Sequence, residues 1–485
     1  MRVLPGLARL VFAHAIAVVV VLPAAAIGCS SKGESDLPVT ASPAHASMFG
    51  HVDVTLEGDF AKLGVLKSVR VAGLAALNVT ATSNRVTVRI QGAPSPGPAS
   101  IDLVGASGSA SNRTAFAYDP PARGVPAHWI AFGASLTQGI QSGGLDAHGQ
   151  LAGWAAQLAK AAGVFQAPPL VVDGAVPPLE PKDFVGNCGA TMDVGKIGNA
   201  LFAAITDADA HQLDLRRARQ DASLATRNYA IGGAKLADVI ASPSGFQRIL
   251  ARIAELPDGD PHEYTSPVTL SQLERIVHED ADVGVSGDLL ANDSDPAVTQ
   301  SDDIHLELMT DVATVKSELE TIMSALGKLH GDYFIANLVD LAAVPNVSDV
   351  RTRRFAAGTE TQASFDAKLA SVRSVIDAYN AALSAAMDPH PNLHIVDLAS
   401  GTKVALAGVK VGSETLTGAK FGGLVSLDHL HFTDTGYALV ANQFVNAIDI
   451  IKGWNIPEVN VEAVHKTDAL SPSALDAAGV HCGAN

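Results

Sequence analysis

Three side chains in this 485-residue chain, Ser135, Asp428 and His431, are of the types that nucleophilic catalysis uses. Asp428 and His431 stand three residues apart, so one turn of backbone can bring the carboxylate to one imidazole nitrogen and leave the other facing a serine. Ser135 follows the short apolar run 129–132, so we expect it on the turn that leaves a buried strand, where a nucleophile must be exposed. Because most serines at strand ends are turn formers, this interpretation depends on the distant Asp428 and His431.

The same segment could instead hold a metal ion, because Asp428 precedes His429 and His431. A site with two histidines lacks ligands for zinc, and no other cluster of histidine or cysteine in the sequence supports it. We therefore expect neither a metal nor an organic cofactor.

Three blocks of the sequence resemble those of the SGNH (GDSL-type) hydrolases. FGASLTQG at 132–139 is similar to the family's GDSLTxG, and DHLHFTDTGY at 428–437 is similar to DxxHPTxxGY. NYAIGG at 228–233, followed by Asp238, resembles NxAxxGAxxxD. The resemblance implies a three-layer α/β/α fold around a parallel, flavodoxin-like sheet.

By this resemblance Ser135 is the nucleophile, His431 is its general base, and Asp428 orients the imidazole. The backbone N–H groups of Ser135 and Gly233 would belong to the oxyanion hole. A glycine there lets the backbone approach the developing oxyanion without a side chain in the way.

The family's third oxyanion donor is an asparagine in a GxND block that follows a strand. The segment LAND matches this block, with Leu290 in place of glycine, and makes Asn292 the donor. In the alternative register Gly287 and Asp288 stand in the Asn-Asp places and leave no side-chain donor, and an Asn-Asp pair is also a common turn former. A second departure is Ala134, which stands where the family has the Asp of GDSL.

The elements that must position these residues alternate between strands and helices. Such alternation predicts a parallel sheet covered by helices on both faces, within a hydrolase domain at 126–455. The expected strands are 129–132, 228–231, 282–286, 333–337 and 393–396, and the expected helices are 200–219, 246–255, 270–278, 306–330, 361–387 and 437–452. Residues 163–225 form an insertion, of which 163–178 could line an acyl pocket or simply pack as a loop. The tail 456–485 has no assigned role.

Residues 38–121 consist of short alternating runs separated by Gly and Pro clusters, which predicts a small all-β immunoglobulin-like sandwich. VTLEGDF at 54–60, RVTVRI at 85–90 and FAYDPP at 116–121 resemble an IPT/TIG module. An unrelated β-sandwich is the alternative. Such modules serve as spacers or as binding accessories.

The first 29 residues have the pattern of a signal peptide, with Arg2 and Arg9 ahead of an apolar stretch. The small residues before Cys29 resemble the lipobox of bacterial lipoproteins, which implies that Cys29 is lipidated and attaches the chain to a membrane. Ser30 in place of Asp favours the outer membrane or cell surface, and 30–37 is a polar linker. An ordinary signal peptide and a transmembrane anchor are the alternatives.

If Cys29 carries lipid, Cys188 and Cys482 remain, and two cysteines of an exported protein are more often bridged than free.

The formal charge of −17 argues against nucleic acid as a partner, and 47% apolar residues are ample for hydrophobic cores.

Together these features predict an exported serine hydrolase that cleaves carboxylic esters through an acyl-enzyme, as esterases and lipases do. The substrate could be a lipid, a short-chain ester or an acylated glycan. The alternative is a catalytically inactive SGNH-like envelope protein that acts as a binding module, which the departures at Ala134 and Leu290 leave open.

Overall fold

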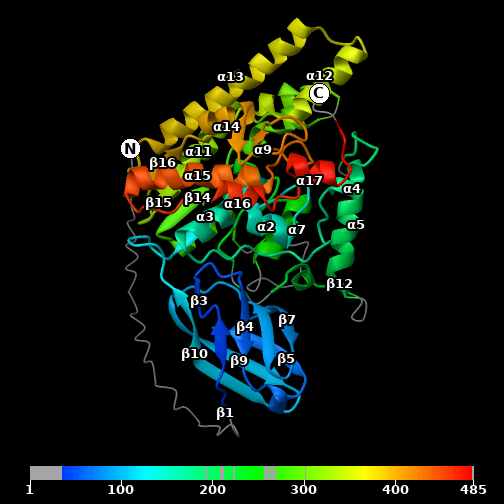
Figure 1. Ribbon diagram of the computed structural model, residues 1–485. Coiled ribbons are helices and arrows are strands. Elements are labelled where there is room, and N and C mark those ends of the chain that lie inside the picture. Colours follow the sequence, from blue (N-terminus) through cyan, green and yellow to red (C-terminus); the bar gives the residue numbers. More distant parts are fainter. Residues whose placement is uncertain are drawn as a thin grey trace, which may run out of the picture.

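The computed structural model describes residues 35–191, 194–207, 212–221, 224, 226–255, 262, 268, 270–300 and 302–482. A β-sandwich, blue in Figure 1, lies on one side of a larger α/β part that follows it in the chain. The signal peptide and Cys29 expected from the sequence lie outside the described residues. Within the described part of the chain, no helix is both long enough and apolar enough to span a bilayer.

Alternating apolar and polar residues build the sandwich. In β8 (Arg85–Arg89), Val86 and Val88 are buried between more exposed neighbours, and Ile101 and Leu103 repeat the pattern in β9 (Gly97–Gly105). One sheet has the order β1-β10-β9-β5-β6 with β3 also on β10, and the other has β2-β4-β8-β7. Neighbouring strands are antiparallel, except that β1 and β3 run parallel to β10. The remaining elements are β1 (Ser35–Asp36), β2 (Thr40–Ser42), β3 (His45–Ser47), β4 (Asp53–Glu57), η1 (Ala61–Leu63), β5 (Leu66–Val71), β6 (Leu74–Ala75), β7 (Leu77–Ala81) and β10 (Ser109–Asp119).

The α/β part is built on a parallel sheet with the order β11-β14-β15-β16, which confirms the predicted fold class. Its strands are β11 (Trp129–Ala131), β14 (Val283–Ser286), β15 (Asp332–Ala336) and β16 (Leu393–Val396). Alternate side chains enter opposite cores: Ile130 and Ile335 face one, whereas Ala131 and Phe334 face the other. A sheet that is apolar on both faces must be covered on both faces.

Helices supply the two covers. The first core is closed by α6 (Leu236–Ile240), α8 (Gln272–Glu279), α11 (Val312–Leu326) and α13 (Gln362–Met387), and the second by α3 (Trp154–Ala162), α14 (Leu398–Ala407) and α15 (Asp434–Lys452). In α11 the buried residues Val315, Leu319 and Ile322 recur at three- and four-residue spacing, as on one face of an amphipathic helix.

A short extended segment at Asn228 lies beside β11 on the edge opposite β14, bridged in parallel to Ala131. After β11, the chain therefore places the segment at Asn228 on one side of β11 and β14 on the other side. In open parallel sheets such a change of direction opens a crevice at the carboxyl ends of the strands, where ligands bind. Residues 132–138 and 287–295 follow β11 and β14 at this edge.

The insertion and the tail complete the fold. The expected helix 200–219 is wrong: α5 (Val194–Ile205) is followed by a short hairpin, β12 (Thr206–Asp207) and β13 (Gln212–Leu213), and by η2 (Leu215–Ala218). The other elements are α1 (Ser135–Gln138), α2 (Ala147–Ala152), α4 (Pro181–Phe184), α7 (Gly245–Glu255), α9 (Ala291–Ser294), α10 (Pro296–Thr299), η3 (Leu306–Leu308), η4 (Leu341–Ala343), α12 (Pro345–Ala356), β17 (Val409–Val411), β18 (Glu414–Leu416), α16 (Val461–His465) and α17 (Pro472–Ala477).

Candidate active site

Ser135 is the first residue of α1, on the turn that leaves β11. Gly133 has φ 128°, a conformation that side chains with a Cβ rarely adopt. A Cβ at Gly133 would also lie 2.6 Å from Oδ1 of Asp288, so only glycine lets that carboxylate approach the turn.

Asp288 follows β14, and its carboxylate binds the backbone of the turn that carries Ser135. Its carboxylate accepts hydrogen bonds from the N–H groups of Ala134 (2.9 Å), Leu136 (2.7 Å) and Thr137 (3.3 Å) and from Oγ1 of Thr137 (2.6 Å). Burial raises the pKa of Asp288, and these donors oppose that rise. The backbone of Ala134 is therefore anchored although its side chain is not the expected aspartate.

The segment that contains Gly233 is tied to the same turn. The N–H of Ile231 donates to the carbonyl of Gly133 (3.1 Å), and the N–H of Gly232 donates to Oε1 of Gln138 (2.8 Å). Gln272 exchanges two hydrogen bonds with the backbone of Gly133, each 3.0 Å long. Gly233 itself has φ 79°. Among the described residues, no hydrogen bond occupies the N–H of Ser135 or that of Gly233.

Asp428 and His431 form the pair expected from their spacing. Nδ1 of His431 lies 2.7 Å from Oδ2 of Asp428, whose Oδ1 accepts from the N–H groups of Leu430 (3.0 Å) and His431 (2.9 Å) and from Oγ of Ser426 (3.1 Å). Burial would raise the pKa of Asp428, but the imidazole and these donors hold it well below its usual range. Burial would lower the pKa of His431, but the Asp428 carboxylate outweighs it and the pKa is raised.

One cavity of about 50 Å³ is lined by both Ser135 and His431. Most of its wall is apolar and includes Leu289, Leu290, Leu338, Leu341, Val344 and Leu430. Among the described residues, Nε2 of His431 is buried without a hydrogen-bond partner. The structure thus brings together the serine, the histidine with its free nitrogen, and the aspartate, although no hydrogen bond joins Ser135 to His431. In enzymes without substrate such bonds are often long and tighten in the complex.

The structure does not bring Asn292 to this cavity. Asn292 lies on α9, and its Nδ2 donates to the carbonyl of Ala234 at 2.9 Å. The Gly-Asp pair directly after β14 occupies the cavity wall instead. A Cβ at Gly287 would lie 2.8 Å from the indole of Trp154, so an asparagine side chain has no room there. The Asp288 contacts therefore favour the register that the sequence analysis ranked second.

His429 contacts a different carboxylate from His431. Its Nδ1 lies 3.1 Å from Oδ2 of Asp349, and φ at His429 is 63°. Within the part of the chain that the structure describes, no cluster of three or more His, Cys, Asp or Glu side chains could hold a metal ion.

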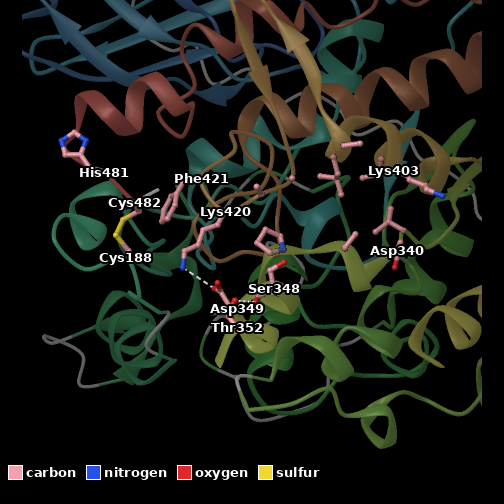
Figure 2. Close-up of a pocket in the computed structure, with 18 residues that line it drawn as sticks. Cys188, Asp340, Ser348, Asp349, Thr352, Lys403, Lys420, Phe421, His481 and Cys482 are labelled. Atoms are coloured by element: carbon pink, nitrogen blue, oxygen red, sulfur yellow. Dashed lines mark hydrogen bonds and ion pairs between the residues drawn. A yellow bond between two sulfur atoms is a disulfide. The ribbon is translucent and has the colours of Figure 1, made fainter. Parts of the chain in front are cut away.

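A groove of about 550 Å³ adjoins the cavity and shares Val339, Asp340, Thr402 and Leu406 with it. Figure 2 shows Lys420 extended toward Asp349, with Phe421 and the disulfide beside them and Asp340 and Lys403 farther along the groove. Nζ of Lys420 lies 3.4 Å from Oδ2 of Asp349.

Cys188 and Cys482 form a disulfide, the pairing expected from the sequence, and both line this groove. The bridge joins the insertion to the tail. Residues 163–178, by contrast, do not line the cavity at Ser135. Phe165 and Ala167 pack into the core of the sandwich, and Val171 and Val176 pack into a cluster around α5 and α7, so this segment is loop packing.

Neither a model of a known protein family nor a curated protein sequence matches the chain. Among solved structures, protein YxiM from Bacillus subtilis is similar over 86% of this chain and 79% of its own, with 12% identity and a TM-score of 0.29. A carbohydrate acetylesterase from Xanthomonas citri is similar over 72% of this chain and 65% of its own, with 12% identity and a TM-score of 0.22. At these scores, the function must be argued from the geometry of the site.

Proposed function

We propose that the chain is an SGNH-like serine hydrolase that cleaves esters of short carboxylic acids, acetyl esters above all. One observation carries the proposal: Ser135 and the unpartnered Nε2 of His431 line one cavity, while Nδ1 of His431 is bound to Asp428. A serine, a base with a free nitrogen and a carboxylate that fixes the tautomer are the parts of acyl transfer.

In this mechanism Oγ of Ser135 attacks the ester carbonyl carbon while Nε2 of His431 takes its proton. The carbonyl oxygen becomes an oxyanion, which the free N–H groups of Ser135 and Gly233 stabilise. His431 then gives its proton to the departing alcohol, and an acyl-serine remains. Water attacks the acyl-serine with His431 again as base, which releases the acid and restores Ser135.

The size of the cavity limits the acyl group. A cavity of roughly 150 Å³ holds one benzene molecule, with six carbons. The cavity at Ser135 has about 50 Å³, a third of that volume, and its apolar wall suits a methyl group. These features favour acetyl over long acyl chains, and so an esterase over a lipase.

The alcohol part of the substrate is proposed to lie in the adjoining groove. The groove presents hydrogen-bonding side chains, among them Ser348, Thr352, Lys403 and Lys420, and one aromatic ring, Phe421. Hydroxyl groups can exchange hydrogen bonds with such side chains, whereas a hydrocarbon tail cannot. Among the substrates considered, this composition supports an acylated glycan.

The proposal is tested by reacting the purified protein with a fluorophosphonate and by measuring p-nitrophenyl acetate hydrolysis. We expect covalent labelling of wild type, and loss of both labelling and turnover in Ser135→Ala. Ser371→Ala, which removes an exposed serine of α13, serves as the matched control and should keep both. Absence of labelling and turnover in a folded wild-type protein would favour the inactive binding module instead.

We further propose that the chain is exported and held at an envelope membrane by lipid on Cys29. The proposal depends on the lipobox resemblance of the residues before Cys29.

A further inference from the structure

Seven polar side chains line the cavity at Ser135, and four of them form hydrogen bonds with other residues of the chain. These four are Asp288, bonded to the serine turn; Asn337, bonded to Asp397 and the N–H of Ala399; Asp340, bonded to Arg373 and the N–H of Ala342; and Thr402, bonded to the carbonyl of Leu398. The other three are Ser135, His431 and Asp295. Ser135 and His431 have their roles in the proposed mechanism. Asp295 has none, and in the described part of the chain no hydrogen bond engages its carboxyl group.

Asp295 lies on the side of the cavity where the proposed oxyanion donor Gly233 is found. Asp295 follows α9 and precedes Pro296, and its N–H donates to the carbonyl of Ala291 at 2.8 Å, so the helical turn continues through it. It therefore shares a helix face with Asn292, three residues earlier. The Asn292 amide contacts Ala234, the residue after Gly233. Asp295 thus extends toward the cavity from the face that meets the Gly233 segment.

We propose that Asp295, in its protonated form, donates the third hydrogen bond to the oxyanion, the role that Asn292 does not reach. This inference rests on the proposed function, because it assigns a catalytic residue to that same reaction. A neutral carboxylic acid in an apolar site can donate to an oxyanion, whereas an ionised one would repel it.

The surroundings of Asp295 favour the neutral form. Burial raises its pKa to about 7; the charges of His431 and Lys235 oppose that rise, and those of Asp293 and Asp288 add to it. An acyl group that fills the cavity displaces water, which disfavours the charged carboxylate further.

The inference gives the reaction two opposing pH requirements. His431 must be neutral to accept the serine proton, so activity rises with pH through the raised pKa of His431. Asp295 must be protonated to donate, so activity falls as pH rises through the pKa of Asp295. The pH profile of kcat for an acetyl ester is therefore bell-shaped, and its alkaline limb belongs to Asp295.

The test compares pH profiles of kcat for p-nitrophenyl acetate in wild type, Asp295→Asn, Asp295→Ala and Asp302→Asn. An asparagine donates at every pH, so Asp295→Asn should keep activity near its optimum and lose the alkaline limb. Asp295→Ala should lose about 10²–10³-fold in kcat. Asp302→Asn removes an exposed carboxylate outside the cavity and should leave the profile unchanged.

An alkaline limb that persists in Asp295→Asn overturns the inference, and so does an Asp295→Ala variant with nearly wild-type kcat. If Asp295→Ala does not fold, as judged by circular dichroism, the Asp295→Asn profile decides alone. The two proposals fail differently. A wild type without turnover and without labelling of Ser135 refutes the hydrolase itself, whereas an active wild type whose Asp295 variants share its profile refutes only the role of Asp295.

Discussion

Asp288 contacts the backbone on both sides of Ser135 because Gly133 leaves room for its carboxylate. The N–H groups of Ala134, Leu136 and Thr137 all donate to Asp288, and the N–H of Ser135 does not. The turn is thereby held while the N–H of Ser135, one of the two proposed backbone donors to the oxyanion, stays free. The carboxylate that anchors the serine turn thus comes from the segment after β14, and not from residue 134, which is alanine.

This relationship predicts that Asp288→Asn lowers kcat for p-nitrophenyl acetate by about 10²-fold, since an amide nitrogen cannot accept the backbone donors and the serine shifts. The free energy of unfolding should fall by about 1–3 kcal/mol. Asp449→Asn is the matched control, because Asp449 also accepts a backbone N–H, that of Ile456, away from the site. The control should lose stability with kcat unchanged; equal kcat in the two variants would contradict the role of Asp288.

Asp428→Asn should reduce kcat by roughly 10³–10⁴-fold, because the imidazole loses the carboxylate that fixes its tautomer and stabilises its charged form. The sign of the pH effect also follows. The Asp428 carboxylate raises the pKa of His431, so its removal lowers that pKa, and the acidic limb of the profile moves to lower pH. Stopped-flow or steady-state pH profiles of the residual activity measure this shift, and a limb that stays in place would argue against His431 as the base.

Leu341→Ala should widen the cavity and change the preferred acyl length. Leu341 is buried and lines the cavity, so shortening it makes room for a longer chain. We expect the ratio of kcat/KM for butyrate over acetate esters to rise about tenfold, near the effect of one or two methylene groups in an apolar pocket. Leu369→Ala, in α13 and outside the cavity, should lose comparable stability, about 2–5 kcal/mol, with an unchanged ratio.

Cys188→Ser should destabilise the protein and impair the groove rather than the cavity. The disulfide closes a loop with a sequence separation of 294, so its loss should lower the free energy of unfolding by about 2–5 kcal/mol. Because the bridge forms part of the groove wall, kcat/KM for an acetylated oligosaccharide should fall severalfold while that for p-nitrophenyl acetate is kept. Equal losses on both substrates would place the alcohol part elsewhere.

Cys29→Ala should abolish incorporation of radiolabelled palmitate in cells and release the protein from the membrane fraction. Cys188→Ser, which removes a cysteine that is not predicted to carry lipid, should keep both the label and the membrane association. Retention of label in Cys29→Ala would leave export by an ordinary signal peptide as the better interpretation.

The sequence was most informative where a pattern is local. The apolar runs that became β11, β14 and β15 have the composition of strands buried on both faces. The spacing of Asp428 and His431 predicted their contact. The expected helix at 200–219 failed because the polar residues around β12 and β13 interrupt the apolar periodicity, and a hairpin forms there instead.

The choice between Asn292 and Asp288 could not be made from local sequence. Both residues follow the same strand. Gly133 leaves room for the Asp288 carboxylate, and Trp154 fills the space that a side chain at residue 287 would need. Only the assembled fold determines these two contacts. Asp295 has no sequence signature, because its place in the cavity wall depends on where the fold puts the residue between α9 and α10.

The disulfide joins Cys188 to Cys482, and the helix α15 that begins at Asp434 is bonded to the tail. His431 precedes α15, and the N–H of Thr435 in that helix donates to Asp468 of the tail at 2.9 Å. The serine turn is made before His431 and the tail during translation, because it precedes them in the sequence. On the proposed mechanism, a chain that ends before His431 lacks its general base. We therefore expect it to show no esterase activity, however well its first half folds.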